Sequence, residues 1–495
     1  MWLAIIDDLG APDFSMQSKL TSSVIDARLA EARTLFEDNR VGEAEGLLRD
    51  LAIHAPARED VALLLAEVLR SQCRLSAAVE AVARLAEAAL FEANIALRAA
   101  AFARECDRHA VAARICDAAL ARGATMPGLL LLAGHVARES GDFAAARRHY
   151  LKALDAGIDP DSENVLGALV NTRRYTDPAD SDRARCEAQF RNGTVSPQAR
   201  ASAGCALAKI LDDLGDAAGA AAVLREANGM MHALHPWRAD DWRRFIAVRQ
   251  DERVAGVSGF ADPRFAPVFI VGVPRSGTTL TATLLARATG ARDRGELRAL
   301  RFIAERLRDG AHLGNAAVVA EAAGVYRMMA RQDDAPARLY LDQDPLNFRW
   351  LDIAAAMFPQ AKVIHLRRDP RDTALSLWSQ DFAHPDMAFA YDFADMAAFM
   401  EGHDALMRHW RESLRVPIHE LDYERLVTDT EVALADLRAF VGAPACEPEE
   451  PSKDSTPVQS ASVWQARQPV YRTSIGRWRR YAPHVPELLQ FFGSK

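Results

Sequence analysis

The sequence is poor in cysteine and lacks any long apolar run. Six cysteines occur among 495 residues, with no Cys-x-x-Cys pair and no zinc-ligand spacing, so we expect reduced thiols within helices. They are Cys73, Cys106, Cys116, Cys186, Cys205 and Cys446. The most apolar stretch, GLLLLAGHVA at 128–137, is far too short to span a membrane.

A secretory signal and an excess of basic residues are also missing. The N-terminal residues MWLAIIDDLG carry no basic segment before the apolar one. With 60 Lys and Arg against 68 Asp and Glu, the net charge is −8, which argues against a general nucleic-acid binder. We therefore expect a cytoplasmic protein with neither nucleic-acid nor membrane partners. A hydrophobic content of 49% and this length indicate a globular chain of more than one domain.

The first half shows helical periodicity and an internal repeat. Alanines recur every 34 residues, and a second small residue and a turn residue recur in the same frame. The recurring alanines are Ala44, Ala78, Ala112 and Ala146. The second small residues are Ala32, Ala66, Ala100 and Gly134, and the turn residues are Asn39, Cys73, Asp107 and Gly141. The pattern resembles the tetratricopeptide repeat, whose helix pairs need small residues where two helices cross closely. Chance register in an alanine-rich bundle is the alternative.

The second half alternates apolar strands with helical stretches. The segments PVFIVGV, ARLYLD, AKVIHL and PIHELDYERLV favour a parallel α/β sheet covered on both faces. We divide the chain into an N-terminal segment at 1–24, a helical repeat domain at 25–235, a linker at 236–265 and an α/β domain at 266–495.

A glycine-rich turn, VPRSGTTL, follows the first of these strands. Gly272-x4-Gly277-Thr278-Thr279 has the length of a nucleoside-triphosphate loop, but Thr278 stands where such loops carry lysine. What remains is a nest of backbone N–H groups with Arg275 beside it, which suits a phosphate or phosphosulfate group. A plain strand-to-helix turn is the alternative.

A second strand end carries a group of arginines. In RRDPRDTALSLWSQ, Arg367, Arg368 and Arg371 precede Ser376 directly after AKVIHL. Several arginines at the end of a buried strand indicate an anion site. A solvated helix start paired with Asp369 and Asp372 is the other interpretation.

These two motifs resemble those of sulfotransferases that use 3'-phosphoadenosine 5'-phosphosulfate (PAPS). Within that family, the order of repeats and transferase resembles tetratricopeptide-fused bacterial members related to protein-tyrosine sulfotransferases. The resemblance covers residues from about 266 to about 482 and implies a P-loop-type parallel-sheet domain without a metal. It implies that the 5'-phosphosulfate is held by Arg275, Ser276, Gly277, Thr278 and Thr279, and the 3'-phosphate by Arg368 and Ser376. Tyr423, Ser462 and Arg477 are implied as further nucleotide contacts.

The resemblance also implies the catalytic groups. Glu296, in RGELRAL, matches the general base of the family, although a single glutamate between two arginines is otherwise a common surface ion pair. The family lysine that stabilises the leaving oxygen is replaced by Gln343 in LDQDPLNF. We hypothesise that Arg275 supplies the missing charge.

The sequence thus predicts sulfuryl transfer from PAPS to an acceptor hydroxyl by in-line displacement. A peptidyl tyrosine, a sugar hydroxyl and a small phenol all fit this chemistry, and the repeat groove is expected to hold a protein or peptide partner. One alternative is a catalytically impaired domain that binds PAP or PAPS on a protein-interaction scaffold, which Gln343 favours. Another is a P-loop kinase or triphosphatase, which the missing lysine disfavours.

Overall fold

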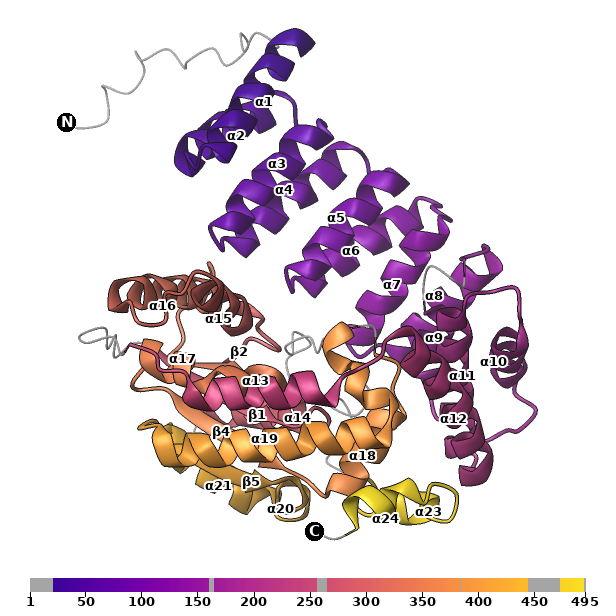
Figure 1. Ribbon diagram of the computed structural model, residues 1–495. Coiled ribbons are helices and arrows are strands. Elements are labelled where there is room, and N and C mark those ends of the chain that lie inside the picture. Colours follow the sequence, from indigo (N-terminus) through magenta and orange to yellow (C-terminus); the bar gives the residue numbers. More distant parts are fainter. Residues whose placement is uncertain (1–20, 160–163, 256–264, 383, 444–471, 494–495) are drawn as a thin grey trace, which may run out of the picture.

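The computed structural model describes residues 21–159, 164–255, 265–382, 384–443 and 472–493. An array of helices comes first, and an α/β domain follows it (Figure 1). The array comprises α1 (Ser22–Glu37), α2 (Val41–His54), α3 (Glu59–Ser71), α4 (Leu75–Ala88), α5 (Ala93–Glu105), α6 (His109–Ala121), α7 (Pro127–Glu139), α8 (Phe143–Asp155), α9 (Val165–Val170), α10 (Ser181–Arg191), α11 (Pro197–Asp213) and α12 (Ala217–Leu234).

The predicted repeat positions have the predicted structural roles. From α1 to α8, the small residues at the two repeating positions lie buried where the paired helices cross. A Cβ on Gly134 would lie 2.4 Å from the ring of Tyr150, so only glycine fits that crossing. The turn residues all adopt left-handed backbone conformations: Asn39 (φ 61°), Cys73 (φ 55°), Asp107 (φ 57°) and Gly141 (φ 88°). The 34-residue spacing is therefore the spacing of helical hairpins, and the prediction of a helical solenoid is confirmed.

The α/β domain is built on a five-stranded sheet in the order β2-β3-β1-β4-β5. Every neighbouring pair of strands is parallel, as predicted. The strands are β1 (Ala266–Gly272), β2 (Arg292–Asp293), β3 (Leu339–Asp342), β4 (Lys362–Arg367) and β5 (Ile418–Asp422). Because the chain moves from β1 to β2 and β3 on one side and then to β4 on the other, a ligand crevice is expected at the carboxyl ends of the central strands.

Helices pack against both faces of this sheet, around two separate hydrophobic clusters. The helical elements of the domain are α14 (Thr278–Thr289), α15 (Ala299–Asp309), α16 (Ala316–Arg331), η2 (Pro345–Trp350), α17 (Leu351–Met357), α18 (Pro370–Trp378), η3 (Pro385–Tyr391), α19 (Phe393–Ser413), α20 (Tyr423–Thr428), α21 (Thr430–Val441), α23 (Trp478–Tyr481) and α24 (Glu487–Phe492). The central strand β1 is apolar and buried along nearly its whole length, as expected for a sheet covered on both faces.

The stretch predicted as a linker contains a further helix, α13 (Ala239–Asp251). Trp242 stacks on Phe399 of α19 with ring centroids 4.9 Å apart. The fully buried Arg249 donates to the carbonyl of Arg349 at 3.0 Å and pairs with Asp352. These contacts attach α13 to the α/β domain.

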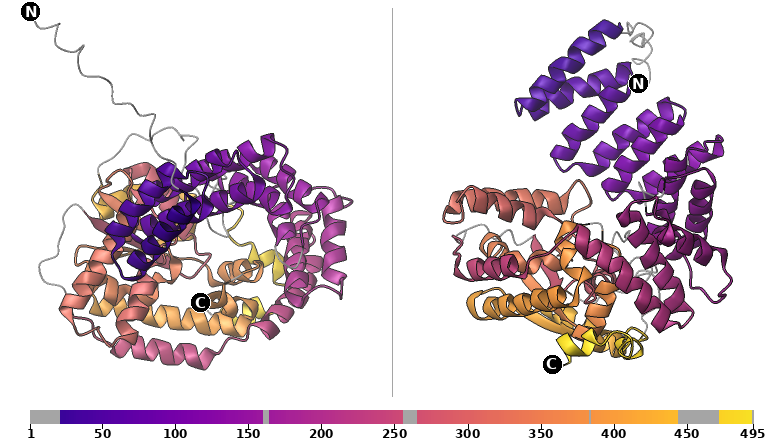
Figure 2. Two further views of the ribbon diagram at one scale, coloured as in Figure 1. Left: turned by 90° about the horizontal axis from the view of Figure 1, so that it is seen from above. Right: turned by 45° about the vertical axis from the view of Figure 1, so that its right-hand side comes forward.

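The last array helices share a hydrophobic core with the α/β domain. One cluster of buried residues runs from α9, α11 and α12 into the helices that cover the sheet, whereas α1 to α6 and part of α7 pack around a separate core. Across this contact, Asn228 of α12 donates to the carbonyl of Trp378 at 2.9 Å. In Figure 2 the array curves in an arc over the α/β domain. The arc brings one side of the array to the carboxyl ends of the strands.

The described residues bear on two expectations drawn from the sequence, one about the cysteines and one about membrane-spanning segments. The cysteines among them, Cys73, Cys106, Cys116, Cys186 and Cys205, are all free thiols. Within the same residues, no helix combines the length and the apolar character that crossing a membrane requires.

Candidate functional site

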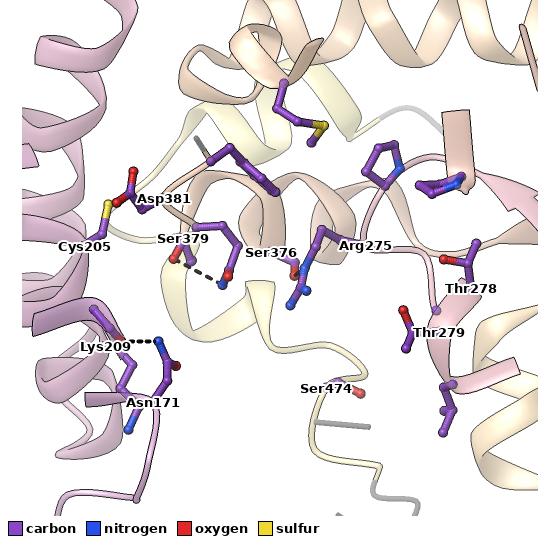
Figure 3. A pocket seen from close by; sticks show the side chains of 18 of the residues that line it. Asn171, Cys205, Lys209, Arg275, Thr278, Thr279, Ser376, Ser379, Asp381 and Ser474 are labelled. Atoms are coloured by element: carbon purple, nitrogen blue, oxygen red, sulfur yellow. Dashed lines mark hydrogen bonds between the residues drawn. The ribbon is translucent and has the colours of Figure 1, made fainter. Parts of the chain in front are cut away.

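A cavity of about 1540 Å³ lies between the array and the carboxyl ends of the strands. One wall comes from the loops after β1, β2, β3 and β4 and from the C-terminal segment. The opposite wall comes from α5, α7, α9, α11 and α12 of the array. Figure 3 shows Asn171 and Lys209 of the array on one side, with Arg275, Thr278 and Thr279 on the other.

The turn after β1 has the backbone of an anion-binding loop. Arg275 and Gly277 adopt left-handed conformations, with φ of 73° and 112°. A Cβ on Gly272 would lie 2.7 Å from the carbonyl oxygen of Leu366, and one on Gly277 would lie 2.5 Å from the ring of Tyr423. Both glycines are therefore required by close packing. Helix α14 begins at Thr278, so its unpaired N–H groups and positive dipole end lie at the cavity wall.

Strand register places the second arginine motif beside this loop. Gly272 of β1 lies opposite Leu366 of β4, so the residues after both strands lie side by side. Arg368 donates to the backbone carbonyl of Arg275 at 2.8 Å, and Arg275 Nε donates to Ser376 Oγ at 3.1 Å. The structure thus brings Arg275 together with Arg368 and Ser376, which were predicted to hold the two different phosphate groups.

Arg368 is oriented by the C-terminal segment as well. Its guanidinium donates to the carbonyl of Ser474 at 3.1 Å and lies 4.7 Å from the ring centroid of Tyr423. Tyr423 Oη and Ser474 Oγ are 2.8 Å apart. Arg368 Nε and Ser276 Oγ are buried, and neither has a hydrogen-bond partner among the residues that the structure describes. Such unsatisfied polar atoms suit a bound anion.

The other two arginines of the motif do not line this cavity. Arg367 is largely exposed and lies 3.7 Å from Glu420. Arg371 pairs with Asp369 at 2.7 Å and lies over the ring of Trp478 at 4.2 Å. For Arg371 the paired helix start, which was the alternative interpretation, is what the structure shows.

Arg477 lines the cavity and also connects the two halves of the chain. Its guanidinium donates to Asp212 of α11 at 2.9 Å, and Tyr481 Oη donates to the same carboxylate at 2.6 Å. The role of Arg477 as a nucleotide contact stays a prediction. The predicted contact Ser462 lies outside the described residues.

Glu296 follows β2 and lines the cavity, into which its side chain is exposed. Enclosure by the cavity walls and the nearby carboxylate of Asp344 raise the pKa of Glu296 to about 7, against the opposing effects of Arg298 and Arg275. The backbone before it is fixed, because Asp293 accepts from the N–H of Gly295 at 2.9 Å. A carboxyl group that titrates near neutral pH is suited to general base catalysis.

Two predicted residues lie outside the main cavity. Gln343 is buried, with 5% of its surface exposed, and its Oε1 has no hydrogen-bond partner among the described residues. Its backbone N–H donates to the carbonyl of Gly295 at 2.9 Å. Ser276 lines a smaller adjacent cavity of about 350 Å³. The structure therefore brings Arg275, Gly277, Thr278, Thr279, Glu296, Arg368, Ser376, Tyr423 and Arg477 together, but neither Gln343 nor Ser276.

Sequence reasoning missed the contribution of the array to this site. Lys209, Asp212 and Asp213 of α11 line the cavity, as does Arg138 of α7. They lie on helices with no distinguishing motif, so no local signal marks them. Asp344 was also missed as a site residue, although its position directly after Gln343 at a strand end was a usable signal.

No group of three or more His, Cys, Asp or Glu side chains arranged to hold a metal ion occurs in the described part of the chain.

Comparison with known proteins identifies the α/β domain. Residues 267–448 match the model of the sulfotransferase family, so this part of the chain is a sulfotransferase-family domain. The chain is 32% identical to an uncharacterised protein of Aquifex aeolicus over 325 residues, which is 61% of this chain and 43% of that protein. It is 33% identical over 104 residues to cytosolic sulfotransferase 14 of Arabidopsis thaliana, covering 19% of this chain and 30% of that one.

The chain thus spans less than half the length of these two relatives. Among solved structures, it is similar to the sulfotransferase domain of the olefin synthase of Synechococcus PCC 7002, with a TM-score of 0.34 and 21% identity. That match covers 50% of this chain and 97% of the solved domain.

Proposed function

We propose that the protein transfers a sulfuryl group from PAPS to the hydroxyl of an acceptor. One observation carries the proposal: a carboxyl group with a pKa of about 7, Glu296, shares a cavity with the phosphate loop and with Arg368. The sulfotransferase-family domain at 267–448 supports the reaction class.

The site residues fit an anionic nucleotide. Arg368 lies beside the turn that contains Gly272 and Gly277, and its Nε is buried without a hydrogen-bond partner among the described residues. PAPS, when bound, supplies the sulfuryl group and a bisphosphate leaving group. Arg275 and the N-terminus of α14 would hold the 5'-phosphosulfate, and Arg368 with Ser376 would hold the 3'-phosphate.

In the proposed reaction, Glu296 accepts the proton of the acceptor hydroxyl. The acceptor oxygen forms a bond to sulfur as the bond between sulfur and the 5'-phosphate oxygen breaks, and PAP leaves with that electron pair. Arg275 lies in the cavity wall and would offset the charge that develops on the leaving oxygen. A positioned base contributes about 10²- to 10⁴-fold to such a rate.

Gln343 supports a second candidate, a domain that binds the nucleotide but is catalytically impaired. The family lysine at this position is absent, and the amide that replaces it is buried outside the cavity wall. Arg275 and the N-terminus of α14 would then have to stabilise the transition-state charge without a lysine.

A transfer assay distinguishes the active enzyme from the impaired domain. It measures radioactive sulfate transferred from PAPS to a tyrosine peptide, a sugar and a small phenol. We expect transfer to at least one acceptor by the natural protein, none by Arg275→Ala and a rate lower by about 10²- to 10⁴-fold in Glu296→Gln. Transfer only after Gln343→Lys would instead favour the impaired domain.

A further inference from the structure

The array also contacts the α/β domain at a place separate from the core that α9, α11 and α12 share with it. There, the turns that precede α4 and α6 meet the turn after α16, which comprises Gln332, Asp333 and Asp334. Asp333 accepts from the backbone N–H groups of Ser76 and Ala77 at 2.8 and 2.9 Å. Figure 1 shows α16 below these helices of the array.

Arg108 contacts all three residues of the turn after α16. It is the residue before α6, in the turn that joins α5 to α6. Its guanidinium donates to Asp334 at 2.8 Å and to Gln332 at 3.1 Å. The same group lies 3.8 Å from Asp333. Only 19% of the Arg108 side chain is exposed, so water screens these interactions less than it screens an ion pair on the open surface.

Asp334 connects Arg108 to the segment that carries the candidate base. One oxygen of its carboxylate accepts from Arg108, and the other accepts from Arg294 Nη1 at 2.6 Å. The other two guanidinium nitrogens of Arg294 donate to the end of α16, to the carbonyls of Ala330 at 2.5 Å and Arg331 at 3.0 Å. The Arg294 side chain is only 7% exposed. Its position is therefore set by the end of α16 and the turn that follows.

Arg294 precedes Glu296 by two residues, and the backbone between them is constrained. The N–H of Arg294 donates to the carbonyl of Leu341 at 2.9 Å. Gly295 adopts a left-handed conformation, with φ of 64°, and its carbonyl accepts from the N–H of Gln343 at 2.9 Å. This turn sets the direction in which the chain leaves β2. A shift of the Arg294 side chain would thus move the segment that carries Glu296.

We infer that Arg108 of the array is a positioning residue for the candidate base Glu296. It acts through Asp334, whose carboxylate it orients toward Arg294. This inference rests on the proposed function. Arg108, Asp334 and Arg294 do not line the main cavity, so they act on the reaction through the position of the base and not through substrate contacts. A misplacement of about 1 Å far from the chemistry can lower a rate by about 10²-fold.

Kinetics of Arg108→Ala test this inference. We expect kcat for sulfuryl transfer to fall about tenfold, with the Kd for PAP and the KM for the acceptor unchanged. Arg108→Lys keeps a cation beside Asp334 and should retain more of the rate than the alanine variant. In a Glu296→Gln protein, adding Arg108→Ala should cause no further loss of kcat, because the residue through which Arg108 acts is already removed.

Hydrogen exchange gives a readout that does not require turnover. The amides on either side of Glu296 are hydrogen-bonded in the α/β domain, since that of Gly295 donates to Asp293 at 2.9 Å and that of Leu297 donates to Asp342. Both amides should exchange faster when Arg108 is replaced by alanine, because the segment between them is held less firmly.

The matched control is Arg114→Ala, which removes an arginine of α6 that pairs with Glu87 inside the array at 2.6 Å. The control should change neither kcat nor the exchange of these amides. Unchanged kcat or unchanged exchange in Arg108→Ala, or an equal effect in the control, would overturn the inference. So would a loss of PAP affinity in Arg108→Ala or a further loss of kcat in the Glu296→Gln protein. Absence of transfer by the natural protein would contradict the proposed function, and hydrogen exchange would still show whether Arg108 holds this segment.

Discussion

At the scale of single residues, the charge state of Glu296 should govern activity. Because the pKa of this carboxyl is raised to about 7, the proposed base should be protonated and inactive below that pH and available above it. We expect kcat to rise with pH through a midpoint near 7. Glu296→Gln should lower kcat at every pH and leave PAP affinity unchanged, whereas Glu305→Gln, which lies outside the cavity, should change neither.

Two neighbours of Glu296 should move this midpoint in opposite directions. Asp344 raises the pKa of Glu296, so Asp344→Asn should shift the pH profile to lower pH and still cap η2. Arg298 lowers that pKa, so Arg298→Ala should shift the profile to higher pH. Profiles measured under single-turnover conditions give both midpoints. Shifts of the same sign would show that Glu296 is not the titrating group.

The residue scale also shows where prediction from sequence was limited. The glycines and threonines of VPRSGTTL could be placed because their spacing implies a turn, and the turn has that backbone. Arg367, Arg368 and Arg371 could not be told apart, because only strand register and local acids decide which one faces the cavity. Gln343 was placed by position, but the orientation of its side chain depends on packing around the strand end.

At the scale of elements, two glycines of the array helices should respond differently to replacement by alanine. A Cβ on Gly134 would meet the ring of Tyr150 at 2.4 Å, whereas one on Gly46 in α2 would meet nothing within 4 Å. Gly134→Ala should destabilise the protein by about 1–3 kcal/mol. Gly46→Ala should stabilise it by about 0.5–1 kcal/mol, because alanine is the better helix former. Urea unfolding followed by circular dichroism measures both, and stabilisation by Gly134→Ala would contradict the described crossing.

A side chain of the α/β domain caps the start of helix α4 and so connects the array to that domain. Asp333, after α16, accepts from the backbone N–H groups of Ser76 and Ala77 at 2.8 and 2.9 Å, at the start of α4. Beside it, Asp334 accepts from Arg108 of the array and from Arg294, two residues before Glu296. Asp333→Ala should cost about 0.5–2 kcal/mol, the usual loss for an N-cap. Protection of the α4 amides from hydrogen exchange should fall with it, and unchanged protection would contradict the contact.

At the scale of the whole molecule, the array is part of the site rather than an appendage. The 34-residue period predicted the hairpins because small residues and left-handed turns are local features. It did not predict that α7, α9 and α11 form a wall of the cavity, because that depends on the curvature of the array and on a core shared across domains. We expect the α9–α12 region to unfold together with the α/β domain, and α1–α6 to unfold separately.

Asp212 is the residue that tests this coupling. It accepts from Arg477 and Tyr481, so Asp212→Ala leaves both donors without this partner at the domain contact. In calorimetric scans, Asp212→Ala should lower the midpoint temperature at which α9–α12 and the α/β domain unfold together. The midpoint temperature for unfolding of α1–α6 should not change. A change confined to the transition of α1–α6 would contradict the shared core.

Calorimetric titration with PAP and with ATP tests the central claim most directly. The natural protein and Arg367→Ala, whose arginine lies outside the main cavity, should bind PAP in preference to ATP, and Arg368→Ala should lose PAP binding. Absence of PAP binding, equal preference for ATP, or an equal loss in both variants would contradict a sulfuryl-donor site at the carboxyl ends of β1 and β4.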